Sequence, residues 1–309
     1  MRSEKQRLVL IDGHAALFRA FYAIPVLTTP TGELVNAVYG FALTLLNSIS
    51  ELEPTHILVA FDASAPTFRH TDFAAYKAQR KETPAELKDQ LGRVKGVVEA
   101  LNMPIFEVSG FEADDVIGTL AVQAAKLKGV EAVIVTGDHD ALQLVRDEKV
   151  LVFMPGRSKK PSVMFDEEEV KKKMGVTPVR VVDLKGLAGD SSDNIPGIKG
   201  VGPKTALDLI RKFGSVEGIY KAIADKSAEG QISNTVLKKL AEGQEIALKS
   251  KMLATIVTEV PIKLDLDACR VSGYDKAKAL ALFEELGFKS LMGRLPQDEF
   301  EQGVQEALF

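Results

Sequence analysis

Nine acidic residues stand in the sequence where a short apolar run or a predicted helix begins or ends. They are Asp12, Asp62, Glu112, Asp114, Asp115, Asp138, Asp140, Asp190 and Asp193. Carboxylate oxygens are hard ligands that suit Mg²⁺ or Mn²⁺ better than zinc or iron. Nine carboxylates exceed what one ion needs, and paired divalent ions commonly catalyse phosphodiester cleavage. The acids therefore predict a site for two Mg²⁺ or Mn²⁺ ions that acts on a phosphodiester.

Each acidic group also has a structural interpretation. Asp12 precedes a glycine, as in an ordinary turn, and residues 190–193 could form an Asx-rich turn. The acids of residues 112–115 could complement a helix dipole. Three acids in four residues nevertheless repel one another unless a cation lies among them. Taken together, the nine positions favour a metal site over nine separate turns and caps.

Three of the acids follow short apolar runs that are typical of buried strands. These runs are residues 8–11, 57–61 and 132–135, followed by Asp12, Asp62 and Asp138. Between the runs, apolar residues recur every three or four positions, as in residues 116–127, which indicates helices. This alternation predicts an α/β fold with a central, mostly parallel sheet flanked by helices. Because ligands gather at the carboxyl ends of parallel strands, the acids should meet at one edge.

Capping signals predict where two further helices begin. Thr83 and Pro84 are typical of a helix that is capped by the threonine and has proline at its first position. Asp166 is a capping residue for a second helix, which Gly175 should end.

The strand pattern fades after about residue 176, where short helices separated by Gly and Pro follow. The last of them are expected over residues 274–286 and 290–295. We therefore expect a nuclease-like α/β core over residues 1–180 and a C-terminal helical subdomain over residues 181–309.

A basic run lies between the second and third acidic groups. It contains Arg69, His70, Tyr76, Lys77, Arg80 and Lys81. Such a run is often a solvated helix face. Next to a metal site, however, its cations could hold a phosphate, and its aromatic residue could stack on a base.

Residues 195–204 have the pattern of a helix-hairpin-helix, which binds the DNA backbone without reading bases. Gly197, Gly200 and Gly202 would let backbone amides approach a phosphate closely, at the start of a helix. Lys199 and Lys204 add the positive charge that phosphate binding requires. The alternative is a glycine-rich turn between two helices.

Composition excludes several other classes of protein. The 309 residues include 43 acids and 39 bases, so a uniformly basic nucleic-acid coat is excluded, although a local basic face is not. The single cysteine, Cys269, excludes an internal disulfide framework and a cysteine-rich zinc site. No apolar run approaches the roughly 18 residues of a membrane helix. We expect a soluble, cytoplasmic protein.

These motifs, in this order, resemble the 5′-nuclease (flap endonuclease) superfamily, most closely the 5′–3′ exonuclease domain of bacterial DNA polymerase I. The matching segments are residues 10–14, 37–41, 61–63, 68–70, 76–77, 110–116, 138–140 and 189–204. The resemblance spans about residues 8–295. It implies a helical arch over the active site, in the region of residues 66–100.

The resemblance also implies roles for the acids. Asp62, Glu112 and Asp114 match ligands of a first metal ion, with Asp12 acting close by, through water. Asp138, Asp140 and Asp190 match ligands of a second ion, which Asp114 is a candidate to share. Asp115 and Asp193 match the rest of the acidic cluster.

The basic run and the hairpin have counterparts in the family as well. Lys77 and Arg80 resemble the arch cations that engage the scissile phosphate, and Tyr76 resembles the aromatic residue beside them. Residues 195–204 resemble the element that binds the duplex backbone, which in relatives also holds a monovalent ion such as K⁺.

The implied function is structure-specific cleavage near the 5′ end of flap, nicked or gapped duplex DNA, in primer removal and DNA repair. RNA primers paired with DNA are plausible substrates, a DNA polymerase in cis or in trans is the implied partner, and the chain is expected to be a monomer. A PIN-like ribonuclease and a non-catalytic module that binds duplex DNA are the alternatives. Duplex dependence of cleavage would distinguish the first, and a missing ligand would indicate the second.

Overall fold

A six-stranded sheet lies at the centre of the described part of the chain, which in this computed structural model comprises residues 6–156, 160–301 and 303. The strands are β1 (Gln6–Asp12), β2 (His56–Ala60), β3 (Ile105–Phe106), β4 (Val130–Val135), β5 (Val150–Met154) and β6 (Val163–Phe165). Their order is β3-β2-β1-β4-β5-β6, and every pairing is parallel except that of β5 with β6. The predicted, mostly parallel sheet is confirmed.

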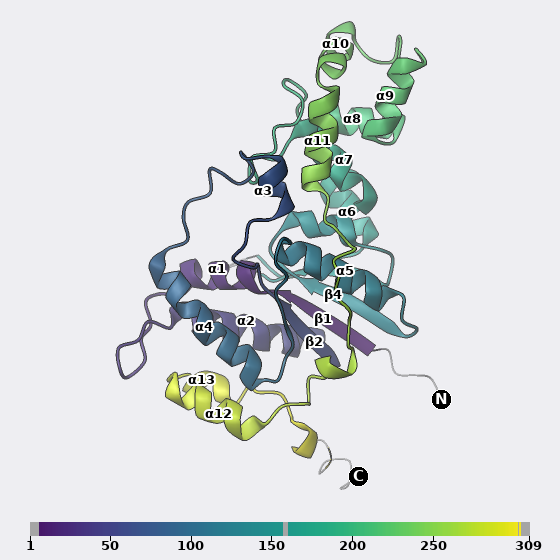
Figure 1. Ribbon diagram of the computed structural model, residues 1–309. Helices are drawn as coiled ribbons and strands as arrows, with labels where there is room; N and C mark the ends of the chain where they lie inside the picture. Colours follow the sequence, from purple (N-terminus) through teal and green to yellow (C-terminus); the bar gives the residue numbers. More distant parts are fainter. Residues whose placement is uncertain (1–5, 157–159, 302, 304–309) are drawn as a thin grey trace.

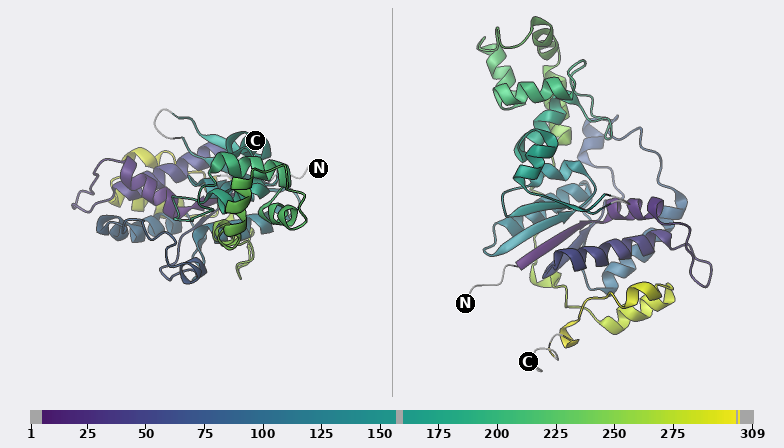
Figure 2. Two further views of the ribbon diagram at one scale, coloured as in Figure 1. Left: turned by 90° about the horizontal axis from the view of Figure 1, so that it is seen from above. Right: turned by 180° about the vertical axis from the view of Figure 1, so that it is seen from behind.

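Helices cover both faces of the sheet, and the central strands β1, β2 and β4 are buried on both sides. Val9 and Ile11 of β1 pack in a core with α1 (Gly13–Ala23), α2 (Asn36–Leu52) and α4 (Ala85–Ala100). Leu8 and Leu10, which point to the opposite face, pack in a second core with α5 (Ala113–Ala125). The view from behind shows α1 and α2 lying across the sheet (Figure 2). Burial on both faces explains why these strands are continuous apolar runs.

Short helices after β6 form a projection that stands above the carboxyl edge of the sheet (Figure 1). They are α6 (Glu167–Met174), α7 (Val181–Ala188), α8 (Pro203–Phe213), α9 (Val216–Ala224), α10 (Asn234–Glu242) and α11 (Gln244–Ala254). Three 3₁₀ helices, His139–Leu144, Pro178–Arg180 and Asp267–Cys269, complete the connections. Within the described residues no strand follows Phe165, as the fading strand pattern predicted.

The C-terminal helices leave this projection and return to the α/β core. Helices α12 (Lys276–Glu285) and α13 (Lys289–Met292) lie below α2 and α4 in Figure 1. Phe283 and Phe288 are buried in the same core as Val94 and Val97 of α4. The helical subdomain that we expected over residues 181–309 therefore does not include these two helices, because they are needed to cover the apolar surface of α4.

The capping predictions are confirmed at one helix and shifted at the other. The Asp166 carboxylate accepts a 2.8 Å hydrogen bond from the Glu169 backbone nitrogen, and α6 ends at Gly175 with φ of +76°. Helix α4, in contrast, has Pro84 rather than Thr83 at its N-cap and has no side-chain cap. The Pro84 carbonyl accepts a hydrogen bond from Leu87 N–H, as the N-cap carbonyl should. Proline has no backbone N–H of its own, so no donor is left without an acceptor at this position.

The chain between β2 and α4 passes over the carboxyl edge of the sheet. It consists of α3 (Phe68–Asp72), which lies near α11 in Figure 1, and a run of turns that leads to α4. Helix α4 packs on α2, so the part of residues 66–100 that faces the acids is the turn region, with Lys77, Arg80 and Lys81. No helix among the described residues is long and apolar enough to cross a membrane.

Candidate active site

A cavity of about 630 Å³ opens at the carboxyl edge of the sheet. Five of the predicted acids line it: Asp12, Asp62, Glu112, Asp114 and Asp138. The cations Lys77, Arg80 and Lys81 line it from the turn region after α3. A second, adjoining pocket of about 340 Å³ is lined by Asp138, Asp140 and Asp190. Since Asp138 belongs to both, the two hollows form one continuous acidic site.

Asp12 is fixed at the end of β1. One carboxylate oxygen caps α1 by accepting from Ala15 N at 2.9 Å, and the other accepts from Thr136 Oγ1 at 2.9 Å. Burial, together with the nearby charges of Asp62 and Asp138, raises the pKa of Asp12 to about 6. Asp12 is therefore not in the turn that the Asp-Gly pair suggested: it ends β1 and caps α1, and its side chain remains part of the acidic site.

Asp62 and Asp114 are held by the start of α5. Asp62 accepts a 2.8 Å hydrogen bond from Ala113 N, and its own N–H bonds to His14 Nδ1 at 2.9 Å. Burial raises the pKa of Asp114 well above its usual value, and the charges of Asp12 and Asp138 raise it further. A carboxylate in such surroundings is stabilised by a divalent cation.

Asp140 and Asp190 both accept hydrogen bonds from Lys185, which was not among the predicted site residues. The Lys185 ammonium donates to Asp140 Oδ1 and, at 2.5 Å, to Asp190 Oδ2. Burial and the neighbouring Asp138 raise the pKa of Asp140 to about 7. Burial alone would raise the pKa of Asp190, but hydrogen bonds from Lys185 and Ser192 lower it. The only sequence signal is that Lys185 lies five residues before Asp190, one helical turn before α7 ends.

Asp115 has a different environment from the metal ligand that we expected. Its side chain is fully buried, and its two oxygens accept hydrogen bonds of 2.8 Å from the Arg69 guanidinium. They also accept from the backbone nitrogens of Glu112 and Val257. Arg69 donates further to the carbonyls of Leu253 and Thr255. The Asp115 carboxylate therefore neutralises a buried arginine that ties α3 to α5 and to the end of α11.

Glu112 and Asp193 are paired with the basic run. Lys77 Nζ lies 2.9 Å from Glu112 Oε1, and Arg80 lies 2.5 Å from Asp193 Oδ1. Burial opposes the charge on Lys77, but Glu112 and Asp193 outweigh it and raise the pKa of this lysine. Lys77 also lies 3.8 Å from Asp193, so these acids hold the two cations at the edge of the cavity.

Tyr76 differs from the base-stacking aromatic residue that we expected. Its side chain is only 3% exposed, and its hydroxyl donates to Glu112 at 3.1 Å and to Asp193 at 3.2 Å. Burial and these two carboxylates raise the pKa of the Tyr76 hydroxyl. Because the ring is covered, the tyrosine links the two acids rather than offering a face to a base.

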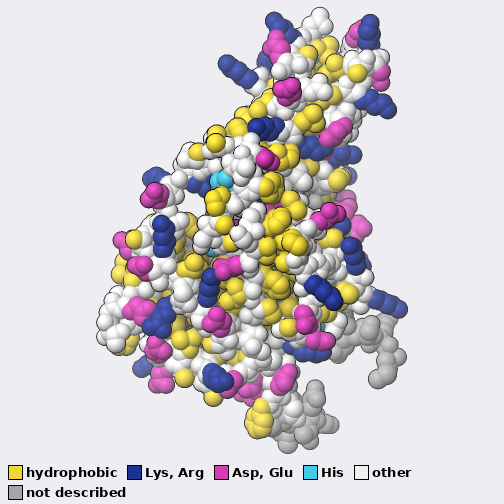
Figure 3. All heavy atoms as spheres, in the orientation of Figure 1, with side chains coloured by type: hydrophobic (Ala, Val, Ile, Leu, Met, Phe, Trp, Pro, Cys, Tyr) yellow, Lys and Arg dark blue, Asp and Glu magenta, His cyan; other side chains and the backbone are white. Residues whose placement is uncertain are grey.

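The predicted hairpin connects α7 and α8 in the helical projection. Gly197 has φ of +60°, and a Cβ there would lie 2.2 Å from the backbone nitrogen of Gly189, so only glycine fits. Gly200, with φ of +80°, accepts a hydrogen bond from Lys239 through its carbonyl, and Gly202 is the N-cap of α8. Lys199, Gly200, Gly202 and Lys204 are exposed. In Figure 3, Lys and Arg side chains are numerous on this projection.

The acids are not preassembled into a compact ion site. Within residues 6–156, 160–301 and 303, no three Asp, Glu, His or Cys side chains converge closely enough to hold an ion. Four of the acids are instead paired with cations of the protein itself: Glu112 with Lys77, Asp193 with Arg80, and Asp140 and Asp190 with Lys185. Their oxygen-only chemistry still fits hard divalent ions, and such ions would have to take over contacts that these side chains now make.

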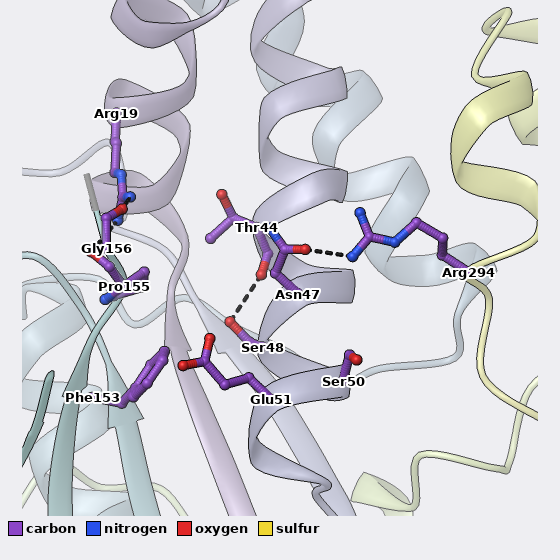
Figure 4. Close-up of a pocket in the computed structure, with 10 residues that line it drawn as sticks. All are labelled: Arg19, Thr44, Asn47, Ser48, Ser50, Glu51, Phe153, Pro155, Gly156 and Arg294. Carbon is purple, nitrogen blue, oxygen red and sulfur yellow. Dashed lines mark hydrogen bonds between the residues drawn. The ribbon is translucent and has the colours of Figure 1, made fainter. Parts of the chain in front are cut away.

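A separate pocket, of about 260 Å³, lies between α1, α2 and the end of β5 (Figure 4). Its arginines already have protein partners: Arg19 donates to the carbonyls of Pro155 and Gly156, and Arg294 donates to Asn47 at 2.5 Å. None of the nine predicted acids lines it.

The raised pKa values predict how stability depends on pH when divalent ions are absent. For a carboxyl group whose pKa is raised by folding, the folded state binds protons more tightly, so stability increases as pH falls through that pKa. Asp140, with a pKa of about 7, should therefore make the protein in EDTA more stable at pH 6.5 than at pH 8. The half-buried His14 and the buried His56, whose pKa values are lowered from 6.5, oppose this trend from about pH 7 downward because the unfolded chain protonates them there. Thermal melting in EDTA measures it.

Two controls accompany this measurement. Saturating Mg²⁺ should reduce the pH dependence because the ion competes with protons for the carboxylates, and Asp140→Asn should flatten it. A melting temperature in EDTA that falls steadily from pH 8 to pH 6.5 would contradict the assignment.

Comparison with known proteins identifies the family of the chain. The model of the 5′–3′ exonuclease N-terminal, resolvase-like domain matches residues 7–175, and the model of the 5′–3′ exonuclease C-terminal SAM fold matches residues 176–277. The chain belongs to the 5′–3′ exonuclease family. The boundary between the two models falls within five residues of the expected division at residue 180.

Two relatives of this exonuclease-family chain are bacterial DNA polymerases I. That of Bacillus subtilis is 41% identical over 306 residues, which are 99% of this chain and 34% of the relative. That of Chloroflexus aurantiacus is 45% identical over 296 residues, which are 94% of this chain and 31% of the relative. The chain thus spans about a third of the length of these relatives.

Solved structures share the fold. A T5 5′-exonuclease superposes with a TM-score of 0.62 at 20% identity, covering 91% of this chain and 99% of that one. A bacteriophage T5 flap endonuclease, described as a complex with DNA and metal ions, gives 0.63 at 19%, covering 97% and 98%. The catalytic core of Rad2 in complex with a DNA substrate gives 0.59 at 16%, covering 94% and 92%. This exonuclease-family chain therefore has the 5′-nuclease fold, as expected.

Proposed function

We propose that this chain is a structure-specific 5′-nuclease that cleaves DNA phosphodiesters with two Mg²⁺ or Mn²⁺ ions. One observation carries the proposal: five acids from the ends of three strands and the start of α5 line one cavity, and Lys77 and Arg80 face them from the turn region above. The acids repel a polyanion such as DNA, so it can enter the site only if cations offset that repulsion. This cavity has both the acids and the cations. Membership of the exonuclease family supports the same reaction.

The acids divide into two sets that would hold the ions. Asp12, Asp62, Glu112 and Asp114 would serve the first ion, and Asp138, Asp140 and Asp190 the second. Bound divalent ions would supply the charge that lowers the pKa of water and stabilises the departing 3′-oxygen. We leave Asp115 and Asp193 out of the ligand sets because arginines already neutralise them.

The cations of the turn region would act on the scissile phosphate. Lys77 and Arg80 are at the edge of the cavity, and each is held by an acid that also accepts from Tyr76. Charge that develops on the phosphate in the transition state is stabilised by cations that are already in place. Tyr76 is a positioning residue in this proposal because its hydroxyl orients Glu112 and Asp193.

The hairpin would anchor duplex DNA beside the pocket of the second ion, which its Pro203 also lines. Exposed Lys199 lies within the glycine-containing residues 197–202 and exposed Lys204 follows them, so this surface offers positive charge to a phosphate. Such a duplex anchor favours a DNA nuclease over a PIN-like ribonuclease. A K⁺ ion at the hairpin, an RNA primer in the substrate and a polymerase acting in cis belong to the same proposal. The length of the relatives supports the last of these.

The deciding experiment is cleavage of a 5′-labelled flap duplex with Mg²⁺, compared with the same reaction in EDTA and with a blunt duplex. We expect cleavage near the flap junction that leaves 5′-phosphate and 3′-hydroxyl ends, and little cleavage of the blunt duplex. Equal cleavage of single-stranded RNA would instead favour the ribonuclease.

Removal of divalent ions should abolish activity and lower stability. The buried carboxylates repel one another without ions, as the raised pKa values of Asp12 and Asp114 indicate. Millimolar Mg²⁺ or Mn²⁺ should therefore raise the melting temperature by several degrees at pH 8. Calorimetry or circular dichroism measures this, with NaCl of equal ionic strength as the control. Full activity in EDTA would refute the two-ion mechanism.

Replacing both Lys199 and Lys204 by alanine should weaken duplex binding without changing the chemistry. These lysines are exposed, so the fold should tolerate the change. Affinity should fall about equally for all sequences, and the salt dependence should flatten by roughly one to two phosphate contacts. Single-turnover cleavage at saturating DNA should change far less. Exposed Lys226 and Lys238, replaced together, are a charge-matched control. If the salt slope is unchanged, the hairpin is only a turn.

A further inference from the structure

Lys185 differs from the other cations of the active site in what it contacts. Lys77 and Arg80 approach the acids from the turn region, as expected for side chains that meet a phosphate. Lys185 instead comes from the last turn of α7 and bridges two carboxylates, Asp140 and Asp190. Both of these acids are assigned to the second ion.

The bridge is enclosed and joins two different elements. Asp140 lies in the 3₁₀ helix after β4, whereas Asp190 follows α7, and only the ammonium group links their side chains in the structure. The side chains of Lys185, Asp140 and Asp190 are 11%, 13% and 13% exposed. An ammonium group that joins two carboxylates in a nearly enclosed place offsets their repulsion, as a divalent ion would. It carries half the charge of such an ion.

A divalent ion can join Asp140 and Asp190 only if the ammonium withdraws. The adjoining pocket of about 340 Å³ offers it room, because this pocket is lined by Lys185 itself, by Gly189 at the end of α7 and by Pro203 at the start of α8. A phosphate near that surface would offer the displaced ammonium a new partner. Withdrawal from the acids is therefore easier when DNA is bound.

We propose that Lys185 is an internal cation that takes the place of the second divalent ion until DNA binds, so that DNA and the second ion bind cooperatively. This inference rests on the proposed two-ion function. It makes Lys185 a positioning residue, which neutralises the site at rest and delays its completion until substrate is present. Linkage requires the coupling to be reciprocal: DNA strengthens ion binding by the same factor by which the ion strengthens DNA binding.

The test compares the full chain with Lys185→Met and Lys185→Gln, which remove the charge but keep much of the side-chain length. Lys173→Met is the matched control, because Lys173 lines the same pocket but is exposed on α6. Mn²⁺ binding without DNA is measured from the electron paramagnetic resonance signal of the free ion. Affinity for a 5′-flap duplex is measured by fluorescence anisotropy in Ca²⁺ and in EDTA.

In the wild type we expect one ion to bind well without DNA and the second to bind weakly. Removing the competing charge should tighten the second ion about tenfold or more. In the same Lys185 variants, the factor by which Ca²⁺ strengthens DNA binding should become smaller. Lys173→Met should change the affinity for the second ion and this factor by less than about fivefold. If both Lys185 variants bind the second ion as weakly as the wild type, the inference is overturned. If the wild type binds no ion, the proposed function itself fails.

A measurement on the wild type avoids any problem with folding of the variants. With ¹³C-labelled lysine, the Cε signal of Lys185, assigned by its loss in Lys185→Arg, should shift as the second ion binds and not as the first does. A signal that stays unchanged when both ions are bound would show that the lysine keeps its carboxylates, and the inference would be wrong.

Discussion

Asp114→Asn should reduce cleavage of a 5′-flap duplex by about a thousandfold or more while leaving flap binding as tight as in the wild type, or tighter. The side chain lies in the acidic cavity next to Asp12 and Asp138, which raise its pKa together with burial. The change removes an ion ligand, so the transition state loses its main source of charge stabilisation. It also removes a negative charge that repels the phosphates of the substrate. Single-turnover cleavage and anisotropy of the same labelled duplex measure both effects.

The matched control for this variant is Asp89→Asn, on the exposed side of α4, which removes the same charge away from the cavity. It should cleave within about twofold of the wild-type rate, since substitutions of exposed residues away from the cavity have small effects. If Asp114→Asn lost binding and cleavage in equal proportion, the residue would serve the fold rather than the chemistry.

Lys77→Met should have the second largest effect, a loss of about a hundredfold or more in single-turnover rate with little change in affinity. The lysine is held 2.9 Å from Glu112 at the edge of the cavity, where a phosphate above the acids would meet it. Its charge matters most when negative charge develops on that phosphate. The Met side chain keeps the apolar stem. The backbone φ of +55° at this position makes β-branched replacements less suitable.

Lys88→Met, on the exposed face of α4, is the charge-matched control. The comparison with the Lys199 and Lys204 double variant is equally informative, because that variant should lose affinity and keep its rate. If Lys77→Met cleaved at the wild-type rate, the basic run would be a solvated surface and the pairing with Glu112 would only neutralise an acid.

The central strands could be predicted from the sequence because burial on both faces makes each one a continuous apolar run. Strand β3 has only two residues, and β6 is a short antiparallel edge strand, so neither has a pattern of its own. The residues of β5 are as apolar as those of β4, but no acid follows them, so the acidic pattern does not identify this strand. The site could be located because parallel strands end at one edge, which places their final residues together.

What the sequence could not predict are contacts between residues that are far apart along the chain. Arg69 meets Asp115 and the carbonyl of Leu253, 184 positions later, and this buried contact takes Asp115 out of the cavity. Tyr76 is buried because its ring packs against Ile195 and Leu253, and Glu112 and Asp193 accept its hydroxyl. An aromatic residue in a basic run gives no sign of these contacts. Lys185 lies in the last turn of a helix, as many exposed lysines do, so its position in the sequence does not distinguish it from them.

The path of the chain after α11 has a consequence for how the protein is made. Residues 255–264 run along α5, where Val257, Val260 and Leu264 donate backbone hydrogen bonds to Asp115, Thr119 and Gln123. Helices α12 and α13 then cover α4, which was synthesised almost 200 residues earlier. Long-range contacts of this kind slow folding. On the ribosome, the apolar surface of α4 would stay uncovered until the C-terminal helices emerge, so a chain cut at residue 180 should be prone to aggregate rather than fold as an independent nuclease core.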